Sequence, residues 1–293
     1  VKKHHDMKII YTPLHGSGVR LVPESLKKFG FTNVKLVPEQ AVIDGNFPTV
    51  ESPNPEERKT MSMAIDLAAK EGADLVLATE PDSDRIGVAL RNKKGEYVLL
   101  NGNQTLVLLM SYQLTRWAER GELDGNQYVV KTIVTSQMAN AVADHFKVKC
   151  YDCLTGFKYI AQKLGKYEQA IPAEKREGYR KMSEEQTRAL RLEYSRYFVF
   201  GGEESYGYLA QDFVRDKDAN SAAIIFAELA AYAESIGKSL LELLHELFEQ
   251  FGVYLEMGKS LVMEGADGAA KIAALSASYS ANPPTELDGV AVS

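Results

Sequence analysis

The stretch Ala78-Thr79-Glu80-Pro81-Asp82-Ser83-Asp84-Arg85-Ile86-Gly87 places three acidic side chains at alternate positions, with an arginine directly after them. An apolar run precedes the stretch and another follows it, as expected for two buried strands. Carboxylates at alternate positions fall on one side of an extended segment or converge inside a tight loop. Because packed carboxylates repel one another, the arrangement normally persists around a cation. Oxygen-only ligands favour a hard ion, so the sequence predicts a Mg²⁺ site formed by Glu80, Asp82 and Asp84.

The acidic loop has three other interpretations, namely an EF-hand, a phosphatase loop and an ordinary turn. An EF-hand is excluded, because a loop starting at Glu80 puts Arg85 where glycine is needed, and one starting at Asp82 ends on Lys93. A phosphatase that uses an aspartyl nucleophile is compatible with Asp82-Ser83-Asp84 after a strand. Solvated acids in an ordinary turn are the structural alternative.

The totals describe a globular chain of moderate size. Its 293 residues suggest about two domains. With 34 basic and 40 acidic residues the net charge is −6, which argues against nucleic acid as the main partner. No apolar run approaches the roughly 18–20 residues of a membrane span, so we expect no membrane partner. Two cysteines provide no disulfide framework, and we expect a cytoplasmic location.

Strands alternate with helices along the chain, which is the signature of an α/β fold. The pattern restarts near residue 101, so we predict one module over 1–100 and another over 101–257. A third start follows in 258–293, with a strand over 259–263, a helix over 268–281 and a strand over 290–292. These residues are too few to close a core. The chain begins at Val1 and ends in a strand-like run, so we expect a piece of a longer protein.

Two further helical segments are predicted. Asn54 is a good N-cap and Pro55 suits the first helical position, so a helix is predicted from there to about Glu71. Residues 166–195 are dense in alternating charges and tyrosine, and we interpret them as a surface helical insertion.

Further stretches carry candidate chemistry. His15-Gly16-Ser17-Gly18 stands between a strand and a helix, where backbone N–H groups could hold a phosphate or simply form a tight turn. Glu203 and Ser205 lie in a glycine-bounded turn at a strand end, which suits hydrogen bonding to sugar hydroxyls or is simply an ordinary turn. Arg215 and Lys217 follow twelve residues or more after Glu203 and could bind a phosphate or mark a helix entry.

The remaining metal and redox candidates are weak. The pair Cys150 and Cys153 lacks the second pair that a zinc site needs, and it lies at a strand rather than at a helix start. Packing is therefore the expected role. Four histidines show no ligand or triad spacing and are interpreted as solvated or packed, namely His4, His5, His145 and His245.

Taken in order, these stretches resemble the α-D-phosphohexomutases, the phosphoglucomutase/phosphomannomutase superfamily. The stretch 12–18 is similar to the opening of that family's second domain, and 80–85 to its metal loop. Residues 155–158 resemble a substrate loop of the third domain, and 202–207 its sugar-recognition loop. The resemblance implies two consecutive α/β modules with mixed sheets sandwiched by helices, followed by the start of a fourth domain in 258–293.

The resemblance also implies a reaction. In that family an enzyme phosphoserine and a hexose phosphate exchange a phosphoryl group through a hexose bisphosphate, with Mg²⁺ at the metal loop. It assigns Arg85 a catalytic role as a clamp on the phosphoserine. The implied substrate-binding residues are Thr155, Gly156, Lys158, Glu203, Ser205, Arg215 and Lys217. Glucose, mannose and pentose phosphates all remain open as substrates, and a non-catalytic sugar-phosphate binding module is a further alternative.

Two departures from the family pattern stand out. The first metal position is Glu80 instead of aspartate, and the glutamate side chain is one methylene longer. The family's phosphoserine loop, of the Thr-Ala-Ser-His-Asn-Pro type, does not occur in the sequence, nor does the phosphate-gripping loop of its last domain. Domains 1 and 4 are therefore the missing partners of this chain, and we expect it to be inactive as a mutase by itself.

Overall fold

The apolar runs of the sequence form two mixed sheets in the computed structural model, which describes residues 1–256 and 261–292. The first sheet has the order β2-β1-β3-β4-β5. Strands β1, β2 and β3 run parallel, whereas β3, β4 and β5 pair antiparallel. The bounds are β1 Ile9–Thr12, β2 Val34–Leu36, β3 Leu75–Thr79, β4 Ile86–Arg91 and β5 Tyr97–Leu99.

The second sheet repeats this plan with one strand fewer. Its order is β7-β6-β8-β9, with β6 parallel to β7 and β8, and with β9 antiparallel to β8. The bounds are β6 Gln127–Thr132, β7 Lys149–Cys153, β8 Tyr197–Gly202 and β9 Tyr208–Leu209. Both sheets are mixed, as expected for the α/β fold class predicted from the sequence.

Helices cover both faces of each sheet, because alternate strand residues point to opposite sides. In β1, Ile9 and Tyr11 pack toward α1 and α7, whereas Ile10 packs toward α2. In the second sheet, Val130 packs toward α5, and Val129 faces the opposite helix layer. The bounds are α1 Gly18–Lys28, α2 Ser62–Glu71, α3 Gly102–Glu119, α4 Met138–His145, α5 Phe157–Gln169, α6 Glu184–Tyr194, α7 Ala219–Ser235 and α8 Leu240–Phe251.

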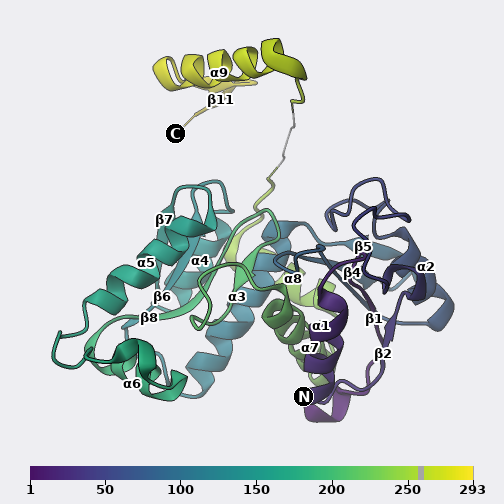
Figure 1. Cartoon of the computed structure of the whole chain (residues 1–293), viewed down its shortest axis with the longest axis horizontal. Helices are drawn as coiled ribbons and strands as arrows, with labels where there is room; N and C mark the ends of the chain where they lie inside the picture. Colours follow the sequence, from purple (N-terminus) through teal and green to yellow (C-terminus); the bar gives the residue numbers. More distant parts are fainter. Residues whose placement is uncertain (257–260, 293) are drawn as a thin grey trace. The chain divides into compact units, whose positions relative to one another are not determined.

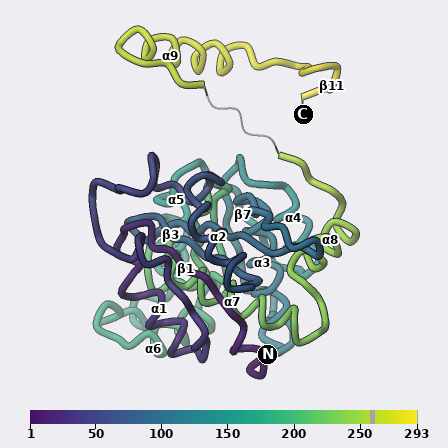
Figure 2. Tube along the Cα trace, turned by 90° about the vertical axis from the view of Figure 1, so that its right-hand side faces the viewer, coloured from purple at the N-terminus to yellow at the C-terminus, as the bar shows by residue number. Residues whose placement is uncertain are grey.

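Helix α7 joins the two halves. It contacts α1, β3 and β4 of the first half, and α3 and β9 of the second. Figure 1 shows α7 beside α1. Its buried side chains, such as the fully buried Phe226, belong to a core cluster that runs through both halves. Residues 1–254 accordingly form one compact unit (Figure 2).

Residues 255–293 form a second unit, and it is described by itself. Its elements are α9 Gly265–Ala281, β10 Glu286–Leu287 and β11 Val290–Ala291, the two strands pairing antiparallel. The helix starts three residues earlier than predicted. Residues 261–263 of the predicted strand 259–263 are not in a strand, and residues 259 and 260 lie outside the described part. Nearly every described side chain of this unit is exposed, as expected for a segment too short to close a core.

The predicted helix from Asn54 begins seven residues late. The Asn54 side-chain oxygen accepts from the Glu56 N–H at 2.9 Å, as an N-cap would, but the chain continues in turns and α2 starts only at Ser62. Tertiary contacts explain the delay. The Thr60 hydroxyl donates to the Ser52 carbonyl at 2.8 Å, and the Arg58 guanidinium donates to the Tyr97 carbonyl at 3.0 Å. These anchors hold the segment before α2 against its neighbours.

The insertion at 166–195 is only partly helical. Helix α5 extends into it as far as Gln169, a single 3₁₀ turn spans Tyr179–Lys181, and α6 follows. Arg191 of α6 is only 5% exposed and pairs with the buried Asp212 at 2.6 Å. The insertion is therefore anchored on the loop after β9 by a buried ion pair.

Among the described residues, no helix combines the length and the apolar character needed to cross a membrane.

Candidate functional site

The acidic loop is the turn of the β3–β4 hairpin, in which Thr79 pairs with Ile86. The Glu80 N–H donates to the Arg85 carbonyl at 3.1 Å, and the Ser83 N–H donates to the Glu80 carbonyl at 2.9 Å. This tight turn brings one oxygen of each carboxylate of Glu80, Asp82 and Asp84 within 4.8 Å of the others. The longer side chain of Glu80 therefore still reaches the other two carboxylates.

Charge in this loop is only partly balanced. Burial raises the pKa of Glu80, Arg85 opposes the rise, and the neighbouring Asp84 adds to it. The Arg85 guanidinium lies 3.4 Å from the Glu80 carboxylate, and Lys217 Nζ lies 3.0 Å from Asp84 Oδ2. The other oxygen, Asp84 Oδ1, is buried and makes no hydrogen bond to the described residues. An unpartnered buried carboxylate oxygen beside two further carboxylates fits a divalent cation.

The glycine-bearing loop after β1 supports the acidic loop. The Ser17 N–H donates to the Pro81 carbonyl at 2.8 Å, and the Ser17 and Ser83 hydroxyl oxygens lie 3.0 Å apart. At Gly16 a Cβ atom would lie 2.2 Å from Pro81 Cα, so only glycine permits this approach. His15 is buried and hydrogen-bonds through both ring nitrogens to the segment around Val42 and Thr49. In the described contacts, this loop therefore packs against the acidic loop and supports it.

The turn Glu203–Gly207, called here the sugar turn, lies directly beside the acidic loop. The Ile86 N–H donates to the Tyr206 carbonyl at 3.2 Å, and Arg85 and Gly207 form an antiparallel bridge. Glu203 is 4% exposed, and its Oε1 accepts from the Gly156 N–H at 2.8 Å. Two loops that are more than 110 residues apart in the sequence are thus joined through their backbones.

The two predicted cations that follow the sugar turn in the sequence, Arg215 and Lys217, have different partners. Lys217 lies between Asp84 and Asp216, each 3.0 Å from its Nζ. Burial alone would lower the pKa of Lys217, but its hydrogen bonds to the two aspartates raise it overall. Arg215 instead pairs with Glu168 of α5 at 3.0 Å. The structure therefore brings Lys217 to the acidic loop and ties Arg215 to α5.

The remaining predicted residues lie near the sugar turn or at the surface. Gly156 donates its N–H to Glu203 and has a φ of 117°, which glycine adopts readily. Thr155 and Lys158 are exposed, and Lys158 Nζ lies 5.1 Å from the ring centre of Tyr159. Ser205 is half-buried within the turn itself.

Two domain models of one protein family match the chain, in the order of its two sheets. The model of the phosphoglucomutase/phosphomannomutase alpha/beta/alpha domain II matches residues 1–95, and that of domain III matches residues 101–251. The chain belongs to the phosphoglucomutase/phosphomannomutase family. The predictions of module boundaries at 1–100, 101–257 and 258–293 stay predictions, since a continuous core joins the first two.

Curated members of the family align with nearly the whole chain. The phosphoglucomutases of Staphylococcus aureus strains N315 and USA300 are 33% and 32% identical to it over 287 residues, which is 98% of this chain. The same alignment covers 47% of each relative. The chain therefore spans about half the length of the curated relatives it matches.

Solved structures of the family share the fold. A phosphomannomutase-like protein from Thermus thermophilus superimposes with a TM-score of 0.60 at 20% identity, over 86% of this chain and 48% of its own. A family protein from Burkholderia thailandensis gives 0.57 at 17% identity, over 82% and 42%. At these identities the likeness shows the fold alone.

Several residues at this candidate site were not predicted. Glu204 points into the protein and contacts Thr132 and Thr135 of the β6–α4 turn. Glu56 lies near Arg85, and burial raises its pKa, with Arg85 opposing the rise and Glu204 adding to it. Thr132 stands at the end of a buried strand, where polar residues commonly line a site. That position is the one signal that could have indicated it.

The two cysteines are packed as expected. Both belong to β7, where residues three apart point to opposite faces of the sheet. The Cys150 thiol contacts Asn140 at 3.3 Å, and burial raises its pKa to about 12. Burial likewise raises the pKa of Cys153 to about 11. Neither thiol has the lowered pKa of a redox or nucleophilic cysteine.

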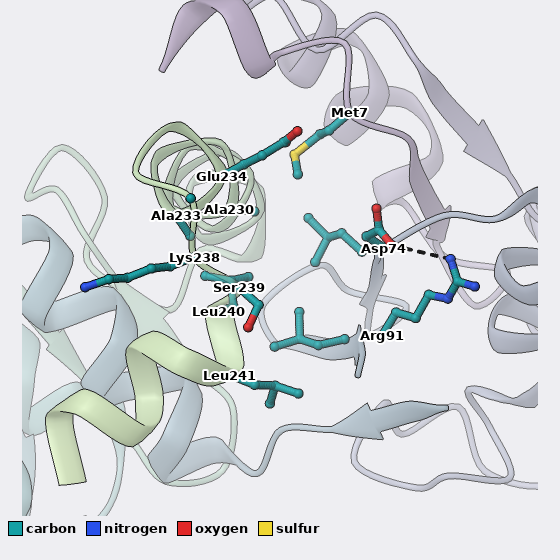
Figure 3. A pocket seen from close by; sticks show the side chains of 13 residues that line it. Met7, Asp74, Arg91, Ala230, Ala233, Glu234, Lys238, Ser239, Leu240 and Leu241 are labelled. Atoms are coloured by element: carbon teal, nitrogen blue, oxygen red, sulfur yellow. Dashed lines mark ion pairs between the residues drawn. The ribbon is translucent and has the colours of Figure 1, made fainter. Parts of the chain in front are cut away.

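A separate hollow of about 330 Å³ lies at the opposite end of the β3–β4 hairpin from the acidic loop. Its apolar lining comes from that hairpin, from Met7 before β1, and from α7 and α8 (Figure 3). The charged side chains at its edge already have partners. Asp74 pairs with Arg91 at 3.7 Å, and Lys238 pairs with Glu246 at 2.7 Å. These paired charges give no indication of a charged ligand, and the hollow is separate from the candidate site at the acidic loop.

Proposed function

We propose that this chain supplies the metal-binding and sugar-facing wall of a phosphoglucomutase-type phosphotransferase, which interconverts sugar 1-phosphates and 6-phosphates. One observation carries the proposal. The three carboxylates of the acidic loop and the sugar turn are joined by the Arg85–Gly207 bridge and by the hydrogen bond from Ile86 to Tyr206. A phosphoryl group and a sugar ring bound at these neighbouring loops would lie within reach of each other.

Glu80, Asp82 and Asp84 are the residues that would hold Mg²⁺. When bound, the ion neutralises charge that develops on a transferring phosphoryl group. Asp84 has a carboxylate whose charge is only partly balanced, since Lys217 occupies only one of its two oxygens and the other is buried without a partner among the described residues.

Other side chains of the site have roles that follow from their positions. Arg85 carries a guanidinium beside the acidic loop and suits a phosphate oxygen of a phosphoserine. Glu203 commits one carboxylate oxygen to Gly156, which fixes its orientation and leaves the second oxygen for a sugar hydroxyl. Lys217 brings a positive charge between the two loops, where it would favour a dianionic ligand.

We propose a phosphoserine carrier and a hexose bisphosphate intermediate, both requiring family domains that lie outside this sequence. A phosphomannomutase or a phosphopentomutase of the same family would use the same wall. We also propose a cytoplasmic location, in keeping with two packed and unpaired cysteines.

Titration calorimetry with Mg²⁺ tests the metal assignment. Wild-type chain should bind weakly, because one expected ligand, a phosphoserine oxygen, is absent. Asp84→Asn should weaken binding at least about tenfold, since it removes one of three ligand charges. Asp74→Asn is the matched control, because it neutralises an aspartate at the far end of β3. Identical isotherms for wild type and Asp84→Asn would refute the assignment.

A further inference from the structure

The turn between β6 and α4 carries two buried threonine hydroxyls that the proposed function does not use. Thr132 ends β6, and Thr135 follows three residues later. They are 0% and 2% exposed, and their hydroxyl oxygens lie 2.7 Å apart. Two adjacent buried hydroxyls require a hydrogen-bond partner.

That partner is Glu204 of the sugar turn. Both threonine hydroxyl oxygens lie 3.0 Å from Glu204 Oε2, and the Glu204 N–H donates to Thr135 Oγ1 at 3.2 Å. Thr135 therefore contacts the side chain and the backbone of the same residue. The first turn of α3 closes the other side, because a Cβ at Gly102 would lie 1.6 Å from the Glu204 carbonyl oxygen. Residue 204 is thus held through its carboxylate and its N–H, and Gly102 leaves room for its carbonyl.

A buried ammonium fixes the threonine turn in its place. Lys131 is 2% exposed, and its Nζ lies 3.2 Å from the Thr135 carbonyl and 3.4 Å from the Thr132 carbonyl. It also pairs with Asp152 of β7 at 2.8 Å. A buried charge is tolerated when it is paired and hydrogen-bonded, as this one is. The threonine turn is therefore anchored independently of Glu204.

We propose that Thr132, Thr135 and Glu204 form a clasp that positions the sugar turn and, through it, the acidic loop. Glu204 lies two residues before Tyr206, whose carbonyl accepts from the Ile86 N–H, and three before Gly207, which bridges to Arg85. The two threonines are positioning residues, since they act on the acidic loop only through the sugar turn. The metal half of this inference rests on the proposed function, whereas the clasp itself does not.

Hydrogen exchange and Mg²⁺ titration on the 293-residue chain test the clasp. The double variant Thr132→Val/Thr135→Val keeps the side-chain shape but removes both donors to Glu204. The double variant Thr132→Ser/Thr135→Ser keeps the hydroxyls and serves as the conservative rescue. Thr115→Val is the matched control, because among the described residues its hydroxyl donates within α3, to the Ser111 carbonyl at 2.8 Å.

In the valine variant, amide exchange at Glu204 and Ile86 should speed up at least about tenfold, and Mg²⁺ affinity should fall several-fold. The serine variant and the Thr115→Val control should behave as wild type in both measurements. A general loss of structure would instead speed exchange throughout the sheets. If the valine variant fails to fold, Glu204→Gln replaces it, with faster exchange expected at the same two amides.

Three outcomes decide the inference. Unchanged protection at Glu204 and Ile86 in the folded variant overturns the clasp. Faster exchange with unchanged Mg²⁺ affinity overturns its link to the acidic loop. Wild-type chain that binds no Mg²⁺ contradicts the proposed metal site, whereas the exchange measurement still decides whether the clasp holds the turn.

Discussion

At the scale of single residues, unusual backbone conformations gather where the site loops meet. Leu14 and His15 in the loop after β1, Ser83 in the acidic loop and Tyr206 in the sugar turn all have positive φ values, between 47° and 67°. Non-glycine residues rarely adopt this region and do so where the surrounding contacts enforce it. The site loops therefore hold their shapes at a local energetic cost, as functional loops often do.

The close approach of Gly16 to Pro81 can be tested by substitution. Gly16→Ala places a methyl group 2.2 Å from Pro81 Cα and must push the two loops apart. We expect a loss of about 1–3 kcal/mol in the free energy of unfolding, measured by urea denaturation. Gly45→Ala is the control, because a Cβ there meets nothing within 4 Å, and its effect should stay within about 0.5 kcal/mol. Equal effects of the two substitutions would contradict the close approach.

At the scale of elements, the start of α8 ties the two sheets together. Ser239 and Glu242 form a capping box, in which the Glu242 carboxylate accepts from the Ser239 N–H at 2.8 Å. The same side chain pairs with Lys93 in the β4–β5 turn at 2.6 Å. Lys93, followed by the Ser239 backbone and hydroxyl, lowers the pKa of Glu242 to about 2. One carboxylate thus caps a helix of one half and contacts the hairpin of the other.

Glu242→Gln tests this link through its pH dependence. A carboxyl whose pKa is lowered on folding stabilises the protein above its unfolded value, and this contribution is lost as the pH falls through the folded value. The wild type should therefore exceed the variant in melting temperature at about pH 6, with the difference shrinking from about pH 4.5 toward 2. Glutamine keeps the capping box. Glu249→Gln, on the exposed face of the same helix, is the control. A difference that does not vary with pH would refute the assignment.

At the scale of the whole molecule, α7 makes residues 1–254 one unit although two sheets are present. The helix packs against both sheets, and its first residue, Ala219, donates its N–H to the Ser83 carbonyl of the acidic loop at 3.1 Å. The acidic loop and the sugar turn are therefore positioned by the shared core. About half of the length of the curated relatives nevertheless lies outside the alignment.

This partial coverage leads to a prediction about activity. We expect the purified 293-residue chain to show no conversion of glucose 1-phosphate to glucose 6-phosphate in a coupled assay with Mg²⁺ and glucose 1,6-bisphosphate. The reason is chemical, because no serine loop of the family's type occurs in the sequence to carry the phosphoryl group. An intact phosphoglucomutase of the family is the positive control, and normal turnover by this chain would overturn the expectation.

Local patterns of apolar and charged residues were enough to predict the α/β class and the acidic loop between two buried strands. The sequence also predicted Lys217 near a phosphate, but not its pairing with Asp84, 133 residues away. Only the tertiary structure decided that pairing, the separation of Arg215 toward Glu168, the late start of α2 and the contact of Thr132 with Glu204. The physical reason is the same in each case. Such contacts join side chains far apart in the chain, and their energies depend on the packing that brings them together.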